Sequence, residues 1–202
     1  MVNLPALVRL SECLAKLPGI GRRTAEKMAV RLLKKNDSLL SELIEALRDA
    51  EKNIDICNEC GGLTLKNENP CKLCLSANRD DRYLCVVEEP SDILLLERAG
   101  EYAGRYHVLM GKLSPGKGYG PSDINIDSLI KRITKGKFEE VILALSTDME
   151  GDATAELIKE KLKNFPIRVS RLASGIPAGS GLAYSDPVTL ARAVKWRVTE
   201  KQ

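Results

Sequence analysis

The chain has 202 residues, a formal net charge of +3 and a hydrophobic share of 44%. This length allows one large domain or one domain with small modules, and the composition is ordinary for a protein that buries a core. Aromatic residues make up only 4%, which argues against base stacking as the main binding mode. No segment is apolar for long enough to span a bilayer, and residues 1–10 lack a signal-peptide pattern, so we expect a cytoplasmic protein.

Residues 4–53 have the periodicity of three helices. The first is expected to stop at Pro18 and Gly19, the second to cover residues 22–35, and the third to start with Asp37 as its N-cap. The first helix has apolar residues at Val8, Leu10, Leu14 and Leu17, and the second has Ala25, Met28, Ala29, Leu32 and Leu33 on one face. The third is expected to bury Leu39, Leu40, Leu43, Ile44 and Leu47.

A glycine-containing turn joins the first two helices. Gly19 and Gly21 let the backbone approach a ligand closely, and the N-terminus of the helix that follows favours an anion such as phosphate. Residues 9–35 carry eight basic side chains against two acidic ones, a local net charge of +6. We expect this hairpin to bind a nucleic-acid backbone without reading sequence. The alternative is a hairpin that serves only packing or subunit contacts, with a solvated basic face.

Four cysteines form two C-x-x-C pairs, namely Cys57, Cys60, Cys71 and Cys74. In a reducing compartment this spacing indicates metal rather than disulfides. Two such pairs complete a tetrahedral four-thiolate site with no position left for water, so we expect one structural zinc ion. The loop-rich segment 55–79 is too poor in apolar residues to fold without such a staple. The alternative is a set of buried or disulfide-bonded cysteines.

From residue 83 onward, short apolar strands alternate with helices. Strands are predicted at 83–87, 106–109, 141–145 and 167–172, and helices at 91–99, 126–135 and 153–163. This alternation predicts an α/β fold with a mostly parallel, covered sheet. A glycine-rich stretch over 175–181 and a helix after Pro187 follow.

Acidic residues follow two of the predicted strands: Glu88 and Glu89 after the first, and Asp148, Glu150 and Asp152 after the third. Parallel α/β folds place their sites at the carboxyl ends of strands. If these two strands are neighbours, Glu88 and the three later acids converge and can hold Mg2+. The alternative is a set of helix N-caps and solvated loop acids, with Asp152 or Gly151 starting the helix over 153–163.

The order of these features resembles the RecR family of recombination mediator proteins over nearly the whole chain. The matching segments are LPGIGRRTAEKMAVRLL, the four-cysteine knuckle, VVEEPSDILLLERAGEYAGRYHVLMGKLSP, ILALSTDMEGDATAELI and VSRLASGIPAGSGLAYSDPVTLARAV. The α/β part resembles the Toprim domain. The resemblance implies four parts: a helix-hairpin-helix region (1–54), a zinc knuckle (55–79), a Toprim domain (80–174) and a C-terminal extension (175–202).

The resemblance also implies a function. Members of this family are non-enzymatic proteins that bind single- and double-stranded DNA. They act with RecO, and in some settings RecF, to load RecA onto single-stranded DNA, and their dimers assemble into ring-like tetramers. We expect Arg22, Arg23 and Lys27 to be the main DNA contacts, with Gly19 and Gly21 as backbone donors.

The sequence departs from the catalytic Toprim pattern. Glu88 matches the glutamate of that pattern, but the Asp-x-Asp pair falls on Ser146 and Asp148, so the first acid is missing. We therefore expect no enzymatic activity, with the acids Glu88, Glu89, Asp148, Glu150 and Asp152 docking RecO. The sequence leaves Mg2+ occupancy of this degenerate site open.

Two rival hypotheses remain at the level of sequence. One is a metal-dependent nuclease or phosphotransferase that uses Glu88, Asp148 and Glu150. The other is a zinc-dependent assembly module whose hairpin makes only subunit contacts. His107, the one histidine, lies in an apolar strand pattern and is expected to be structural. No P-loop consensus is present, and Lys112 and Lys117 do not supply one, so we predict no ATPase activity.

Overall fold

A computed structural model describes residues 4–34, 38–173, 175–176 and 179–197. The chain forms two compact units, Met1–Ile54 and Asp55–Gln202, and each is considered by itself. Within the described ranges, no helix is long and apolar enough to cross a membrane.

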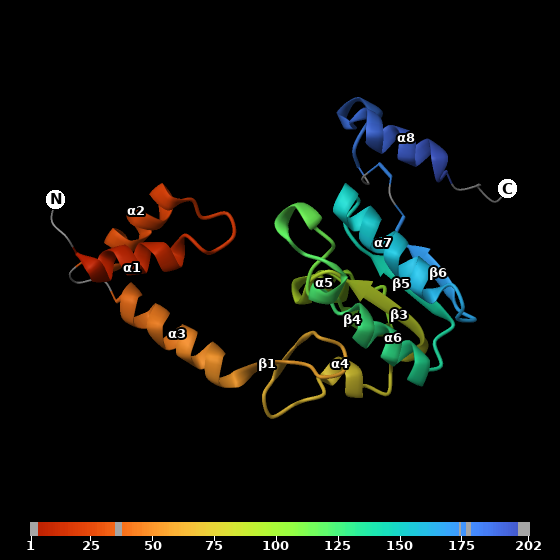
Figure 1. Ribbon diagram of the computed structural model, residues 1–202, viewed down its shortest axis with the longest axis horizontal. Coiled ribbons are helices and arrows are strands. Elements are labelled where there is room, and N and C mark those ends of the chain that lie inside the picture. Colours follow the sequence, from red (N-terminus) through yellow and green to blue (C-terminus); the bar gives the residue numbers. More distant parts are fainter. Residues whose placement is uncertain (1–3, 35–37, 174, 177–178, 198–202) are drawn as a thin grey trace. The chain divides into compact units, whose positions relative to one another are not determined.

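The first unit is helical (Figure 1), with α1 (Pro5–Leu14), α2 (Arg22–Leu32) and α3 (Leu39–Asn53). Helices α1 and α2 pack against each other, and α2 buries Ala25, Ala29 and Leu32. The three helices are confirmed, but α1 and α2 are shorter than predicted. The expected burial of the apolar side chains of α3 is wrong, because no residue of α3 is buried within the described unit. The expected N-cap Asp37 lies outside the described residues, and Ser38 occupies the N-cap position of α3.

The second unit contains a four-stranded sheet in the order β4-β3-β5-β6. The strands are β3 (Asp80–Val87), β4 (Gly104–Val108), β5 (Glu140–Ala144) and β6 (Arg168–Arg171), and each neighbouring pair is parallel. The predicted parallel α/β sheet is therefore confirmed, with β3 and β4 each starting earlier than expected.

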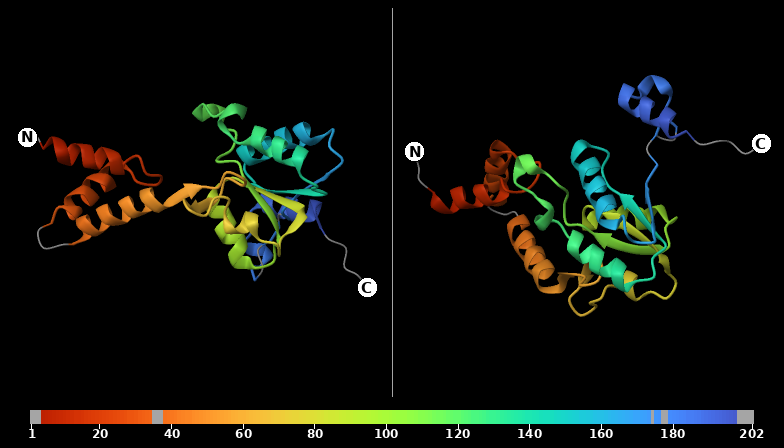
Figure 2. Two further views of the ribbon diagram at one scale, coloured as in Figure 1. Left: turned by 90° about the horizontal axis from the view of Figure 1, so that it is seen from below. Right: turned by 45° about the vertical axis from the view of Figure 1, so that its right-hand side comes forward.

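Helices cover both faces of this sheet (Figure 2). Because side chains alternate along a strand, Leu84 and Val86 of β3 face one layer, and Cys85 and Val87 face the other. The first pair packs with α6 (Ile126–Lys135) and α7 (Met149–Leu162), and the second packs with α5 (Pro90–Ala99). The loop between β4 and α6 includes two short 3-10 turns, Pro115–Lys117 and Pro121–Asp123.

Helix α7 begins four residues before the predicted start at Ala153. Its N-cap is Asp148, whose carboxylate accepts a hydrogen bond from the Gly151 amide at 2.7 Å. The alternative in which Gly151 or Asp152 starts this helix is therefore wrong, although one of the acids, Asp148, is a helix N-cap as that alternative held. A Cβ atom on Gly151 would lie 2.2 Å from the carbonyl oxygen of Ser146. Glycine is therefore needed here because the first turn of α7 packs closely against the chain that follows β5.

The remaining elements are short. Strands β1 (Ile54–Ile56) and β2 (Leu63–Leu65) form a two-stranded sheet, and α4 (Lys72–Leu75) follows them. Near the C-terminus, a 3-10 turn (Leu182–Tyr184) precedes α8 (Pro187–Lys195), which has no buried residue. The helix predicted after Pro187 is confirmed, and Asp186 caps it through the amides of Val188 and Thr189.

His107 lies inside the sheet layer with 3% of its surface exposed. Its Nε2 atom lies 3.1 Å from the Asn125 carbonyl oxygen, and its Nδ1 atom is buried with no hydrogen-bond partner among the described residues. Burial lowers the pKa of the ring to about 4. The imidazole is therefore neutral at physiological pH and plays a structural role, as the apolar strand pattern predicted.

This burial predicts a pH-dependent loss of stability. Because the ordinary pKa is 6.5 and the folded pKa is about 4, the unfolded chain binds the proton more readily as pH falls through this window. The wild type should lose about 2 kcal/mol more stability than His107→Gln between pH 7.5 and 5. Urea unfolding of both proteins at each pH measures the difference. An equal loss in the two proteins would show that His107 does not carry the effect.

Candidate metal centre, acidic edge and basic hairpin

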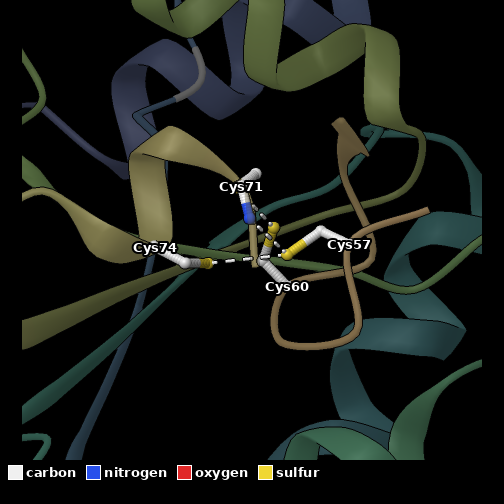
Figure 3. A group of neighbouring side chains, drawn as sticks. All are labelled: Cys57, Cys60, Cys71 and Cys74. Atoms are coloured by element: carbon white, nitrogen blue, oxygen red, sulfur yellow. Dashed lines mark hydrogen bonds between the residues drawn. The ribbon is translucent and has the colours of Figure 1, made fainter. Parts of the chain in front are cut away.

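The four cysteines meet at one point between the β1–β2 turn and α4 (Figure 3). Their sulfur atoms all lie within 4.8 Å of one another. The Sγ atoms of Cys57 and Cys74 are 3.9 Å apart, and those of Cys60 and Cys71 are 3.7 Å apart. A tetrahedral four-thiolate site with metal–sulfur bonds of about 2.3 Å places its sulfurs about 3.8 Å apart, so the cluster could hold a metal ion.

The disulfide alternative disagrees with the structure, because all four cysteines are free. Of the two other cysteines, Cys85 is buried in β3, whereas Cys13 is exposed. Among the described residues, the four cysteines are the one group of three or more Cys, His, Asp or Glu side chains placed to share an ion.

Tight backbone turns aim the sulfurs inward. Gly61 has a φ of +75°, and a Cβ atom there would meet Val108 at 3.2 Å, so the first turn needs glycine to pack against β4. Asn69 joins the two turns: its side chain accepts a hydrogen bond from the Asn58 amide at 3.0 Å and donates one to the Ile56 carbonyl at 3.1 Å.

Hydrogen-bond donors surround the sulfurs and favour thiolates. The amides of Gly62 and Cys71 donate to the sulfurs of Cys60 and Cys57, each at 3.3 Å. Hydrogen bonding from Cys60, together with the nearby Arg132 guanidinium, lowers the pKa of Cys74 to about 6. The hydrogen bond between Cys60 and Cys74, together with burial, raises the pKa of Cys60. The cluster therefore needs a cation before all four groups can ionise together.

The four-cysteine cluster is hydrogen-bonded to the sheet. Arg105 of β4 donates to the carbonyls of Leu73 and Cys74, each at 2.8 Å, and pairs with Asp81 at 2.6 Å. The Val108 amide donates to the Cys60 carbonyl at 2.7 Å. Both turns of the knuckle are thus bonded to β4 or to residues beside it.

The acidic residues partly converge, because β3 and β5 are neighbours in the sheet. The Glu88 carboxylate accepts hydrogen bonds from the amide and the hydroxyl of Ser146, each at 2.7 Å. That hydroxyl also lies 3.1 Å from Asp148. The Lys112 ammonium bonds to Asp148 and to the Ser146 hydroxyl, and it lowers the pKa of Asp148 to about 2.

The other predicted acids have different partners. Glu150 accepts a hydrogen bond from Ser114, while Glu89 belongs to the capping box of α5. Asp152 pairs instead with two arginines, Arg171 at 2.7 Å and Arg192 at 3.1 Å. The structure therefore brings together Glu88, Asp148 and Glu150, and it places Glu89 and Asp152 elsewhere.

Lys112 is the residue of this edge that the sequence did not reveal. In the sequence it lies 36 residues before Asp148, so nothing there links it to the acids. Its glycine-rich loop suggests only a comparison with a P-loop, which it does not match. The signal that could have found it is topological: the loop after β4 leaves the same edge of a parallel sheet as the acids.

The basic residues of the hairpin are exposed. Gly19 adopts a φ of +78° and Gly21 is the N-cap of α2, with open space where a Cβ atom would lie at either position. Arg23 and Lys27, four residues apart on α2, are both exposed. Arg22 is 93% exposed and pairs with Glu26 at 3.4 Å, a contact that a ligand can displace at small cost.

Comparison with known proteins matches the same three regions. Family models match residues 7–51 as "RecR, helix-hairpin-helix", residues 82–173 as "Toprim domain" and residues 175–198 as "RecR, C-terminal".

Relatives match over nearly the full length. Proteins named Recombination protein RecR from Brucella canis and Bartonella bacilliformis are each 45% identical, and the one from Desulfatibacillum aliphaticivorans is 40% identical. The alignments cover 96% of this chain in each case, and 96%, 95% and 96% of the three relatives in that order.

The fold is that of a protein that joins a helix-hairpin-helix unit to a Toprim domain. The chain belongs to the RecR family of recombination proteins.

Proposed function

We propose that this protein is a non-enzymatic recombination mediator that holds DNA through its backbone. It acts with RecO, and in some settings RecF, to help load RecA onto single-stranded DNA. The observation that carries the proposal is the exposed basic hairpin of the RecR-type helix-hairpin-helix region. A protein that acts on DNA in this way belongs in the cytoplasm, beside the nucleoid.

The hairpin has the parts that a phosphate site needs. Gly19 and Gly21 keep the backbone amides at the start of α2 open to a ligand, and the helix dipole favours negative charge there. Arg22, Arg23 and Lys27 surround this end with positive charge. Such contacts hold single- or double-stranded DNA without reading its sequence, and their strength depends steeply on salt.

The acidic edge supports a non-enzymatic role. A Toprim-type nuclease or phosphotransferase would use Glu88, Asp148 and Glu150 as oxygen ligands of a metal ion. Here Ser146 stands at the first position of the Asp-x-Asp pair, and the Lys112 ammonium lies among the same oxygens. Incubating the protein with DNA and Mg2+ tests the alternative, which predicts cleavage that Glu88→Ala abolishes.

The DNA-binding proposal predicts the effect of removing two hairpin charges. Arg23→Ala combined with Lys27→Ala should weaken binding to a 20-nucleotide single strand at least tenfold near physiological salt. It should also reduce the slope of log K against log salt by about 1.4, since two phosphate contacts to a single strand are lost. Fluorescence anisotropy across salt concentrations measures both quantities.

The matched control is Lys161→Ala on α7 with Lys163→Ala at its C-cap, which removes the same charge from the other unit. It should leave affinity nearly unchanged. Equal losses in the two double variants would mean that binding follows net charge rather than the hairpin. Unchanged affinity in the hairpin variant, with circular dichroism showing a folded protein, would refute the assignment.

We infer that the ion of the four-cysteine cluster is zinc and that its role is structural. Four thiolates suit zinc and fill its coordination sphere. Through Arg105 and Val108 the knuckle is bonded to β4. The ion would then fix the loop-rich segment on the Toprim domain, beside the chain that enters from the hairpin arm.

Replacing one ligand tests this role. Cys57→Ser should lose its zinc, measured by mass spectrometry of the metal content, and should unfold at a lower temperature or fail to assemble. The loss is large because structural zinc contributes on the order of 10 kcal/mol to folding. Cys13→Ser, at an exposed cysteine, should keep its zinc. A folded, assembled Cys57→Ser protein with a selective DNA-binding defect would contradict the structural role.

We propose that the acids at this edge, with Glu150 as the main contact, dock RecO. Carboxylates suit a basic partner, and the Glu150 side chain is 33% exposed. Glu150 also holds the Ser114 loop, so its replacement has two effects that must be separated.

In a pull-down, Glu150→Ala should therefore reduce RecO capture at least several-fold. Ser114→Ala, which releases the loop but keeps the carboxylate, should not reduce capture. Equal losses in both variants would assign the effect to the loop, and normal capture by Glu150→Ala would contradict the contact.

The expected homodimers and ring-like tetramers are part of the same proposal. The exposed apolar side chains of α3, which include Leu39, Leu43, Ile44 and Leu47, support a subunit contact in the first unit. Mass measurement in solution, with and without DNA and across salt concentrations, tests assembly and DNA binding together.

A further inference from the structure

The Lys112 side chain enters the acidic edge as its central cation. It comes from the loop that follows β4, and 23% of the side chain is exposed. Its ammonium bonds to Asp148 and lies 2.9 Å from the Ser146 hydroxyl. The same nitrogen lies 3.8 Å from Glu88 and 3.9 Å from Glu150.

These four neighbours are the oxygen groups that a divalent ion would use at this edge. Mg2+ is held by carboxylates at about 2.0 to 2.1 Å and keeps several waters, so it must sit between the same oxygens. The ammonium already fills that position. A metal ion and the ammonium would repel each other at close range, so the two cannot share the site.

We propose that Lys112 is the resident cation of this site, a built-in substitute for the divalent metal ion. The wild-type protein is then indifferent to Mg2+ and Mn2+ here. Removing the ammonium while keeping the carboxylates converts the edge into a divalent-cation site. This inference concerns the charge balance of the second unit alone, so it stands or falls separately from DNA binding.

The charge balance explains why a cation is required. Glu88, Asp148 and Glu150 bring three carboxylates to one ammonium, and Lys117 approaches Glu150 only at 4.0 Å. The hydrogen bond to Asp148 raises the pKa of Lys112, so the ammonium stays protonated over the whole physiological range. Without it, the carboxylates repel one another until another cation binds or a proton is taken up.

The test is a titration of the purified full chain with Mn2+, with the electron paramagnetic resonance signal of the free ion as the readout. Mn2+ is a hard ion that prefers oxygen ligands, so the thiolate cluster does not compete for it. The variants are Lys112→Met, which keeps the length of the side chain without its charge, and Lys112→Arg, the control that keeps the charge.

The wild type and Lys112→Arg should bind no Mn2+ at this edge. Lys112→Met should bind one ion per chain with a dissociation constant of about 10⁻³ M or tighter. Its melting temperature should fall in metal-free buffer and recover when Mn2+ is added. Adding Glu88→Gln to Lys112→Met should abolish both the binding and the recovery.

A second variant keeps the test decisive if Lys112→Met does not fold. Lys112→Met with Glu150→Gln leaves two uncompensated negative charges, as in the wild type, and keeps Glu88, Asp148 and Ser146 as ligands. Saturable Mn2+ binding by either charge-removing variant supports the proposal. Failure of every folded charge-removing variant to bind Mn2+ overturns it. Binding of one ion by the wild type that Glu88→Gln abolishes also overturns it.

Discussion

The parallel pairing of β3 with both β4 and β5 is the constraint on which the second unit depends. Strand β4 joins β3 to the cysteine knuckle, because Arg105 and Val108 of β4 bond to the backbone of both cysteine turns. Because β3 pairs with β5, Glu88 at the carboxyl end of β3 lies beside Ser146, which follows β5. Two hydrogen-bonded ladders that share β3 thus fix the four-cysteine cluster and the acidic edge relative to each other.

Each of the two charged centres of this unit brings several acidic groups together, and the two differ in the source of the compensating cation. The knuckle gathers four ionisable thiols, which need an external cation before they can all lose their protons. The acidic edge gathers three carboxylates around a cation that the chain itself supplies. On the proposed assignments, the first centre makes folding depend on a bound metal ion, whereas the second draws its cation, Lys112, from the chain itself.

Much of this architecture was accessible from the sequence. The order of helices and strands and the four-cysteine cluster followed from periodicity and spacing, because these signals are local. The start of α7 was missed because Gly151 looked like a helix boundary, whereas its missing side chain serves close packing against Ser146. Lys112 was missed for another reason: its hydrogen-bond partners Ser146 and Asp148 lie 34 and 36 residues away, and only the sheet topology brings them together.

The first turn of α7 carries two attachments that are mechanically separate. Glu150 and Asp152 are two residues apart, so on a helix they point to nearly opposite sides. Glu150 holds the loop through Ser114, and Asp152 holds the C-terminal segment through Arg192. Helix α8 buries no residue of its own, and Arg192 joins it to Asp152 and to the carbonyl of Thr147. Breaking the contact between Asp152 and Arg192 would therefore release a hold on the C-terminal helix without touching the hydrogen bond between Ser114 and Glu150 at the acidic edge.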